Sequence, residues 1–94
     1  MMNVAMHYVG VFNWIVGLQD EHYVLPCSAT LRELIGAIHT RHGALPPDTF
    51  LSDGETVCPS VVFMVQGNAC RRLDAPLGDG SEVSVMALTP TVGG

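Results

Sequence analysis

The sequence contains no lysine, few charged residues and no long apolar run. Its four basic residues are all arginines, they face nine carboxylates, and the formal net charge is −5. Phosphate backbones repel a chain with this balance, so we expect no nucleic acid partner. The longest apolar run, Val61–Val65, has five residues and is too short to cross a bilayer, so we expect no membrane partner either.

The cysteines are also few. Cys27, Cys58 and Cys70 are odd in number and widely spaced, which argues against a disulfide framework and against a zinc site. We interpret them as reduced thiols, mostly buried. The first residues, Met1–Val4, contain no basic residue, and polar residues interrupt the apolar stretch that follows. A secretory signal is therefore not predicted, and we expect a cytoplasmic location.

The chain has 94 residues, 48% of them apolar, which is enough for one packed domain but not for two. We predict a folded domain over 1–88 and a flexible C-terminal tail over 89–94. β-Branched and aromatic residues indicate strands, the first two of them paired antiparallel across a turn. The predicted strands are Val4–Val11, Glu21–Pro26, Val61–Val65, Cys70–Leu73 and Glu82–Leu88, with a tight turn at Gln66–Ala69 before the fourth.

One helix has a clear sequence signature. Thr30 and Glu33 fit a capping box, in which the hydroxyl accepts from a helical N–H and the carboxylate reaches back to the cap. Gly43 is expected to end the helix after a basic last turn. The apolar stripe consists of Leu31, Leu34, Ile35 and Ile38. Single helical turns are predicted at Phe12–Val16 and Pro47–Leu51.

Two pairs of polar residues leave alternatives open. His39 and His42 lie one turn apart at the end of this helix, where imidazoles are favourable next to the helix dipole. Metal binding is the alternative, and we prefer the first interpretation. Arg71 and Arg72 indicate either a solvated strand end or a docking site for an acidic partner surface, and again we favour the first.

The last strand separates its side chains between two faces. Val83, Val85 and Ala87 share one face, and Ser84, Met86 and Leu88 share the other. A helix that covers one face of a mixed sheet gives an α+β domain with an open second face. Met86 and Leu88 would then form an apolar patch on that open face, beside the tail.

The tail, Thr89–Gly94, ends on two glycines. Gly93 and Gly94 have no Cβ, so their backbone can pass through a slot that is too narrow for side chains. Pro90 restricts the backbone and lowers the entropy lost on binding. Six extended residues span about 20 Å at roughly 3.3 Å each, enough to carry Gly94 into the active site of another protein. A frayed terminus without function is the alternative.

The order of elements, two short segments and the terminal diglycine together resemble the ubiquitin-like β-grasp sulfur carriers. The segments are Val62–Gly67 and Pro76–Val83, and the resemblance spans about Val4 to Gly94. The family includes the small subunit of molybdopterin synthase and the sulfur carrier of thiamine biosynthesis. The resemblance implies a β-grasp fold, with a mixed sheet of four to five strands and one main helix packed on one face.

The resemblance also implies a carrier rather than an enzyme. An E1-like enzyme would use ATP to adenylate the carboxylate of Gly94, and a desulfurase or sulfurtransferase would supply sulfur for a thiocarboxylate. The acceptor would be a biosynthetic enzyme such as the large subunit of molybdopterin synthase or thiazole synthase, and no cofactor would bind this chain. We favour molybdenum cofactor biosynthesis, with thiamine, cysteine and other pathways open. The implied partner-binding residues are Gly93, Val92, Thr91, Pro90, Leu88 and Met86.

Three other functions remain as alternatives. The chain could be a protein modifier that is conjugated through Gly94, although chains linked through its own lysines are impossible because it has none. It could also be a non-covalent β-grasp module that binds through a sheet edge or the open face. The third alternative is an enzyme that uses Cys58 or Cys70 with a histidine.

Overall fold

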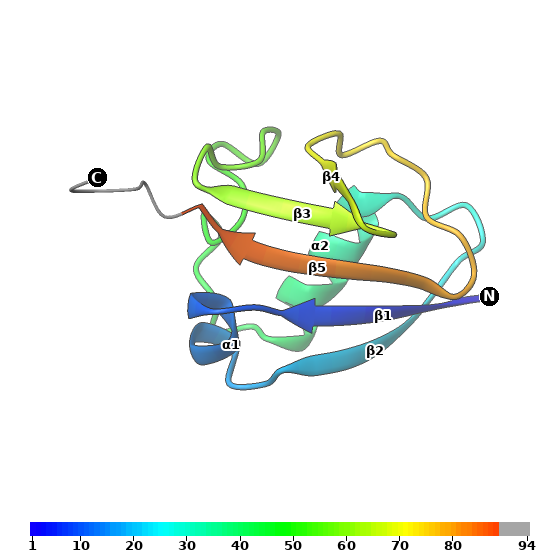
Figure 1. Cartoon of the computed structure of the whole chain (residues 1–94), viewed down its shortest axis with the longest axis horizontal. Coiled ribbons are helices and arrows are strands. Elements are labelled where there is room, and N and C mark those ends of the chain that lie inside the picture. The colour runs from blue at the N-terminus through cyan, green and yellow to red at the C-terminus, as the bar shows by residue number, and fades with distance from the viewer. Residues whose placement is uncertain (89–94) are drawn as a thin grey trace.

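The structure is a computed structural model, and it describes residues 1–88. Figure 1 shows a single sheet with a long helix across one face. The elements in chain order are β1 (Met2–Tyr8), α1 (Val11–Val16), β2 (Asp20–Leu25), α2 (Leu31–Arg41), β3 (Val61–Val65), β4 (Asn68–Cys70) and β5 (Ser81–Ala87). Neither helix in this range has the length and hydropathy that a membrane span requires.

The strands form one mixed sheet in the order β2-β1-β5-β3-β4. β1 pairs antiparallel with β2 and parallel with β5, and β3 is antiparallel to both of its neighbours. Because α2 covers only one face, the other face of the sheet stays open (Figure 1). The predicted α+β fold of the β-grasp type, with five strands and one main helix on one face, is confirmed.

The β1/β2 hairpin is confirmed with shifted ends. β1 stops at Tyr8 rather than Val11, because the chain turns at Gly10, which has φ 62°, directly into α1. α1 matches the predicted helical turn and ends at Gly17, whose φ of 86° lies in the left-handed region that favours glycine. The pairing runs from Met2↔Leu25 to His7↔Asp20.

The predicted turn and fourth strand after β3 are wrong by two residues. Gln66 and Gly67 alone form the turn, with φ values of 51° and 81°, the combination of a two-residue type I′ hairpin. Val65 consequently pairs with Asn68, and β4 covers Asn68–Cys70 instead of Cys70–Leu73. The side-chain Nδ2 of Asn68 donates to the backbone carbonyl of Gln66 at 3.3 Å, which helps to hold Gln66 in its left-handed conformation.

α2 begins where predicted, but a tertiary contact and not the capping box satisfies its first N–H groups. The N–H groups of Leu31 and Arg32 donate to the carbonyls of Ala75 and Leu73 at 3.1 and 3.0 Å. The Thr30 hydroxyl makes no cap bond to the backbone and instead donates to the Glu33 carboxylate at 3.3 Å. The chain segment before β5 therefore completes the start of the helix.

At its other end, α2 stops at Arg41 with His42 as the C-cap residue, and the His42 N–H donates to the Ile38 carbonyl at 2.8 Å. Gly43, which was predicted to end the helix, lies two residues beyond its last residue and has no positive φ. The glycine is therefore not the physical reason for the stop.

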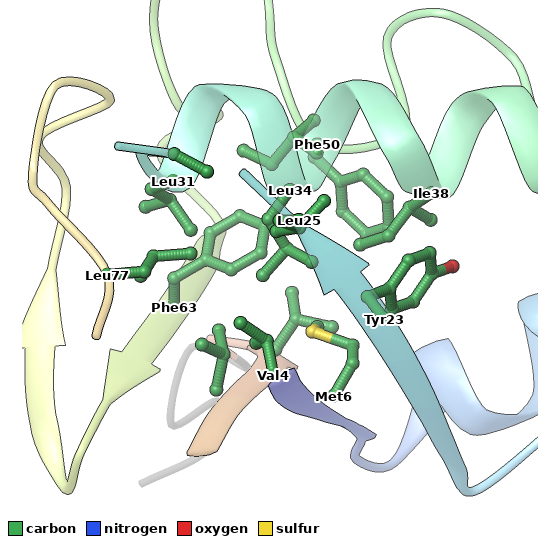
Figure 2. Close-up of a cluster of buried hydrophobic side chains, with 14 of the residues drawn as sticks. Val4, Met6, Tyr23, Leu25, Leu31, Leu34, Ile38, Phe50, Phe63 and Leu77 are labelled. Atoms are coloured by element: carbon green, nitrogen blue, oxygen red, sulfur yellow. The ribbon is translucent and has the colours of Figure 1, made fainter. Parts of the chain in front are cut away.

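The core lies between α2 and the sheet, as Figure 2 shows. Phe50 is fully buried at its centre, with its ring 5.3 Å from that of Phe12 and 5.6 Å from that of Phe63. The helical turn predicted at Pro47–Leu51 is wrong. Residues 47–50 form a non-helical turn, in which the Thr49 N–H donates to the Pro46 carbonyl. The predicted stripe of α2 is confirmed, because its four residues are at most 1% exposed: Leu31, Leu34, Ile35 and Ile38.

Candidate functional site: the end of β5 and the open face of the sheet

β5 delivers the chain to the edge of the domain from the middle of the sheet. It lies between β1 and β3, so both of its sides are paired. After its last residue, the Leu88 N–H donates to the Ser60 carbonyl at 2.7 Å. On the other side, the Val9 N–H donates to the Val85 carbonyl at 3.0 Å. The point from which the chain continues beyond Leu88 is therefore held on both sides.

Only part of the predicted site falls within the described residues. Met86 lies on the open face and is partly buried, as the alternation in β5 predicted, and Leu88 is 56% exposed. Five predicted site residues lie outside the described range: Pro90, Thr91, Val92, Gly93 and Gly94. The predicted tail over 89–94 lies outside it as well.

The open face carries an apolar strip across β3 and β5. Val62 stands opposite Met86, and Met64 stands opposite Ser84 in the same antiparallel pair. All four residues are partly buried, and Met64, Ser84 and Met86 line a shallow hollow. Methionine side chains adapt well to a partner surface, so this strip suits protein contact.

A charged group borders the apolar strip, and sequence reasoning missed it. His7 on β1 is hydrogen-bonded through Nδ1 to Asp20 and through Nε2 to Glu82, the second at 3.2 Å. The bond to Asp20 raises the pKa of His7 above its ordinary value against the opposing effect of burial, and Glu82 adds to the rise. The alternation of side chains along β1 puts His7 on the open face. The carboxylates of Asp20 and Glu82 come close to it only through the pairing of β1 with β2 and with β5.

Arg71 has a structural role that neither sequence interpretation gave it. It is exposed overall, but its guanidinium donates to the carbonyls of Val57 at 2.7 Å, Val61 at 3.2 Å and Cys58 at 3.4 Å. Arg72 is exposed, and within residues 1–88 it pairs only with the equally exposed Asp74. The favoured interpretation as a solvated strand end therefore fits Arg72, and Arg71 instead ties β4 to the chain before β3.

The thiols and the histidines of α2 have separate surroundings. All three cysteines are free, but Cys27 is exposed, so the prediction that they are mostly buried is wrong. Cys58 and Cys70 are half-buried, and each thiol lies 3.6 Å from a backbone carbonyl oxygen. His42 binds the Glu21 carboxylate, His39 packs on Phe50, and residues 1–88 contain no group of three side chains placed to hold a metal.

The arrangement of strands and helix places the chain among ubiquitin-like proteins of the β-grasp fold. Three solved structures with this fold match nearly the whole chain. Small archaeal modifier protein 1 from H. volcanii matches with a TM-score of 0.82 and 18% identity, over 95% of this chain and 100% of the other. Urm1 from Trypanosoma brucei matches with a TM-score of 0.77 and 19% identity, over 98% and 95%. A candidate molybdopterin converting factor, subunit 1, from Pyrococcus furiosus matches with a TM-score of 0.74 and 28% identity, over 95% and 100%.

The family model of the ThiS family matches residues 6–94, so the chain belongs to the ThiS family. None of the curated proteins shows a significant sequence match to it. Proteins of this family are small ubiquitin-like carriers, which act with activating and biosynthetic enzymes and are not catalysts themselves. The resemblance to sulfur carriers and the prediction that this chain is not an enzyme are therefore confirmed.

Proposed function

We propose that the chain is a sulfur carrier whose active group is the carboxylate of Gly94. The observation that carries the proposal is the ThiS family match, which extends through the terminal diglycine on a β-grasp body. An E1-like enzyme would bind the tail through Pro90, Thr91, Val92 and Gly93, and we propose the cytoplasm, where ATP is available, as the setting. The carrier binds no cofactor of its own in this scheme, because ATP is held by the activating enzyme.

The chemistry explains why the end of the chain needs a partner. A carboxylate with a pKa of about 3.5 is ionised at neutral pH and is a poor electrophile. One of its oxygens attacks the α-phosphorus of ATP, and pyrophosphate leaves. A persulfide on a desulfurase or sulfurtransferase then attacks the acyl carbon, and AMP leaves. A thiol cleaves the resulting acyl disulfide, which releases the thiocarboxylate and leaves a disulfide on the donor. Glycines at the last two positions let this carbon enter a narrow active site.

The open face supplies the contact that brings the partner to the tail. Met86 and Met64 form its apolar part, and Leu88 stands exposed where the chain leaves the domain. Apolar surface of this kind, bordered by polar groups, is typical of protein interaction sites. We propose that the activating enzyme and the sulfur acceptor use this face in turn. The acceptor we favour is the large subunit of a molybdopterin synthase, because one similar structure is a candidate small subunit of the converting factor.

The intact mass of the protein tests this function. After incubation with an E1-like enzyme, ATP and a sulfur donor, the mass should rise by the difference between one sulfur and one oxygen atom. The variant without Gly94 has the same folded body and is the matched control, and its mass should not change. Conversion of that shortened chain, or a wild-type mass that never changes, would contradict the proposal.

A protein modifier is the second candidate function. It is favoured by the fold shared with small archaeal modifier protein 1, and both functions begin with the same activated carboxylate. The last basic residue is Arg72, so trypsin would leave residues 73–94 attached to a modified lysine. Proteomics of cells that produce the chain should search for this long remnant rather than for Gly-Gly alone. Its absence from other proteins would remove the modifier and leave the carrier.

A further inference from the structure

Exposed apolar side chains gather in one short part of the chain. Of the large hydrophobic residues that are strongly exposed, five fall between positions 9 and 18, and Trp14 is 86% exposed. The segment 9–19 contains no charged residue. We call these five residues the α1 patch: Val9, Val11, Trp14, Ile15 and Leu18.

The α1 patch is not needed to pack the domain. Phe12 is the buried residue of α1, 4% exposed, and its ring packs against that of Phe50, while Val16 is partly buried against the core. Trp14 has the largest apolar surface of any side chain, and here it lies in water. A solvent-exposed apolar patch on a small protein marks an interaction site more often than a structural need.

The α1 patch lies where the chain leaves the domain. Figure 1 shows α1 at the same end of the molecule as the C-terminal end of β5. The Val9 N–H donates to the Val85 carbonyl at 3.0 Å, so the patch begins beside the C-terminal part of β5. A hollow next to α1 is lined by Val11, Ile15 and Ala87, the residue before Leu88.

We propose that the α1 patch is a second docking surface for the enzyme that adenylates Gly94, distinct from the open face. This inference rests on the proposed function. Six residues follow Leu88, the last of them Gly94, and they span at most about 20 Å. An enzyme that closes around Gly94 must therefore approach this end of the domain. The surface of the enzyme that meets α1 is expected to be apolar and uncharged, because residues 9–19 contain no charged side chain. We choose the activating enzyme over the acceptor because both candidate functions require it.

The test compares adenylation kinetics of surface variants. Trp14→Ser combined with Leu18→Gln replaces two of the five patch side chains, including the most exposed one. Because both side chains are exposed the fold should persist, which thermal unfolding checks. Val24→Gln is the matched control, since Val24 is 51% exposed on the edge strand β2, outside the α1 patch and outside the apolar strip on β3 and β5. With an E1-like enzyme and ATP, the KM for the carrier should rise about 10-fold or more in the double variant, with kcat nearly unchanged. The control should behave as the wild type.

The other outcomes separate the inference from the function it rests on. If the wild type is not adenylated at all, the proposed function fails. If the double variant is adenylated with a wild-type KM while Met86→Gln is impaired, the function stands and this inference is wrong. An effect confined to sulfur transfer to the acceptor would contradict the choice of partner. Concentration-dependent self-association that the double variant abolishes, with unchanged adenylation, would assign the patch to a second copy of the chain instead.

Discussion

At the scale of single residues, Glu21 is the most constrained ionisable group. Its side chain is 8% exposed and accepts hydrogen bonds from the hydroxyl groups of Tyr8 at 2.6 Å and Tyr23 at 3.0 Å. His42 Nε2 lies 2.7 Å from the same carboxylate. Burial alone would raise the pKa of Glu21, but these three partners together lower it, so the carboxylate is ionised. Arg41 stacks 4.0 Å above the Tyr23 ring, and the cluster joins β2 to the end of α2.

Replacing this carboxylate should be costly. Glu21→Ala leaves two buried tyrosine hydroxyls without their acceptor, and we expect the free energy of unfolding to fall by about 2–4 kcal/mol. Glu55→Ala is the control, because Glu55 pairs with Arg32 in an exposed ion pair at 3.3 Å and should cost at most about 0.5 kcal/mol. Urea denaturation measures both. Equal stability of the two variants would contradict the role of the cluster.

His39 and His7 should make stability depend on pH with opposite signs. Burial lowers the pKa of His39 below 6.5, and its Nε2 is buried without a hydrogen-bond partner in 1–88. The unfolded chain therefore binds this proton more readily, and stability is lost as pH falls below about 6.5. The pKa of His7 is raised by Asp20 and Glu82, so its contribution is present below 6.5 and is lost as pH rises through the folded value.

Urea midpoints at about pH 5.5 and pH 7.5 test these signs. His39→Met removes the buried imidazole, so stability should fall less on acidification than in the wild type. In His7→Gln, the loss of stability that the wild-type His7 causes as pH rises should be smaller. A His39→Met protein that is as sensitive to acid as the wild type would show that the buried imidazole does not control this range.

At the scale of elements, local patterns were predictable and tertiary contacts were not. The stripe of α2 and the two faces of β5 follow from spacing alone, and both are confirmed. α2 starts where the capping box predicted, but the capping box is not what satisfies its first N–H groups. They donate to the carbonyls of Leu73 and Ala75, more than forty residues away. The hairpin at Gln66 was misplaced because a left-handed glutamine is uncommon. No pattern in 44–60 indicated that Phe50 would be the centre of the core.

The Arg71 contacts give a prediction at this scale. Arg71→Ala removes the donors that hold the carbonyls of Val57, Cys58 and Val61, and should lower the free energy of unfolding by about 1–3 kcal/mol. Arg72→Ala is the matched control and should cost at most about 0.5 kcal/mol. The same segment contains Ser60, so amide exchange at Leu88 should quicken in Arg71→Ala only. If Arg71→Ala kept wild-type stability and wild-type amide exchange at Leu88, the proposed structural role of Arg71 would be wrong.

At the scale of the whole molecule, residues 1–88 form a body with two apolar surfaces near its C-terminal end, and the proposed chemistry belongs to Gly94. A backbone bond to Ser60 holds Leu88 directly after β5, which is paired on both sides, and two apolar surfaces lie beside that point, the open face and the α1 patch. The open-face residue Met86 was predictable from strand alternation. The α1 patch was not, because apolar residues in a short helix are expected to face the core. The role of Gly94 remains a proposal that rests on family membership and on the chemistry of a diglycine end.

Adenylation of Gly94 is tested most directly by pyrophosphate exchange. An E1-like enzyme should return labelled pyrophosphate to ATP only when this chain is present with a free carboxylate at Gly94. A variant with one alanine appended after Gly94 keeps the same body and should give only the background rate. If the appended variant supports exchange as well as the native chain, the carboxyl group of Gly94 is not the group that is activated, and the account of this protein as a carrier is wrong.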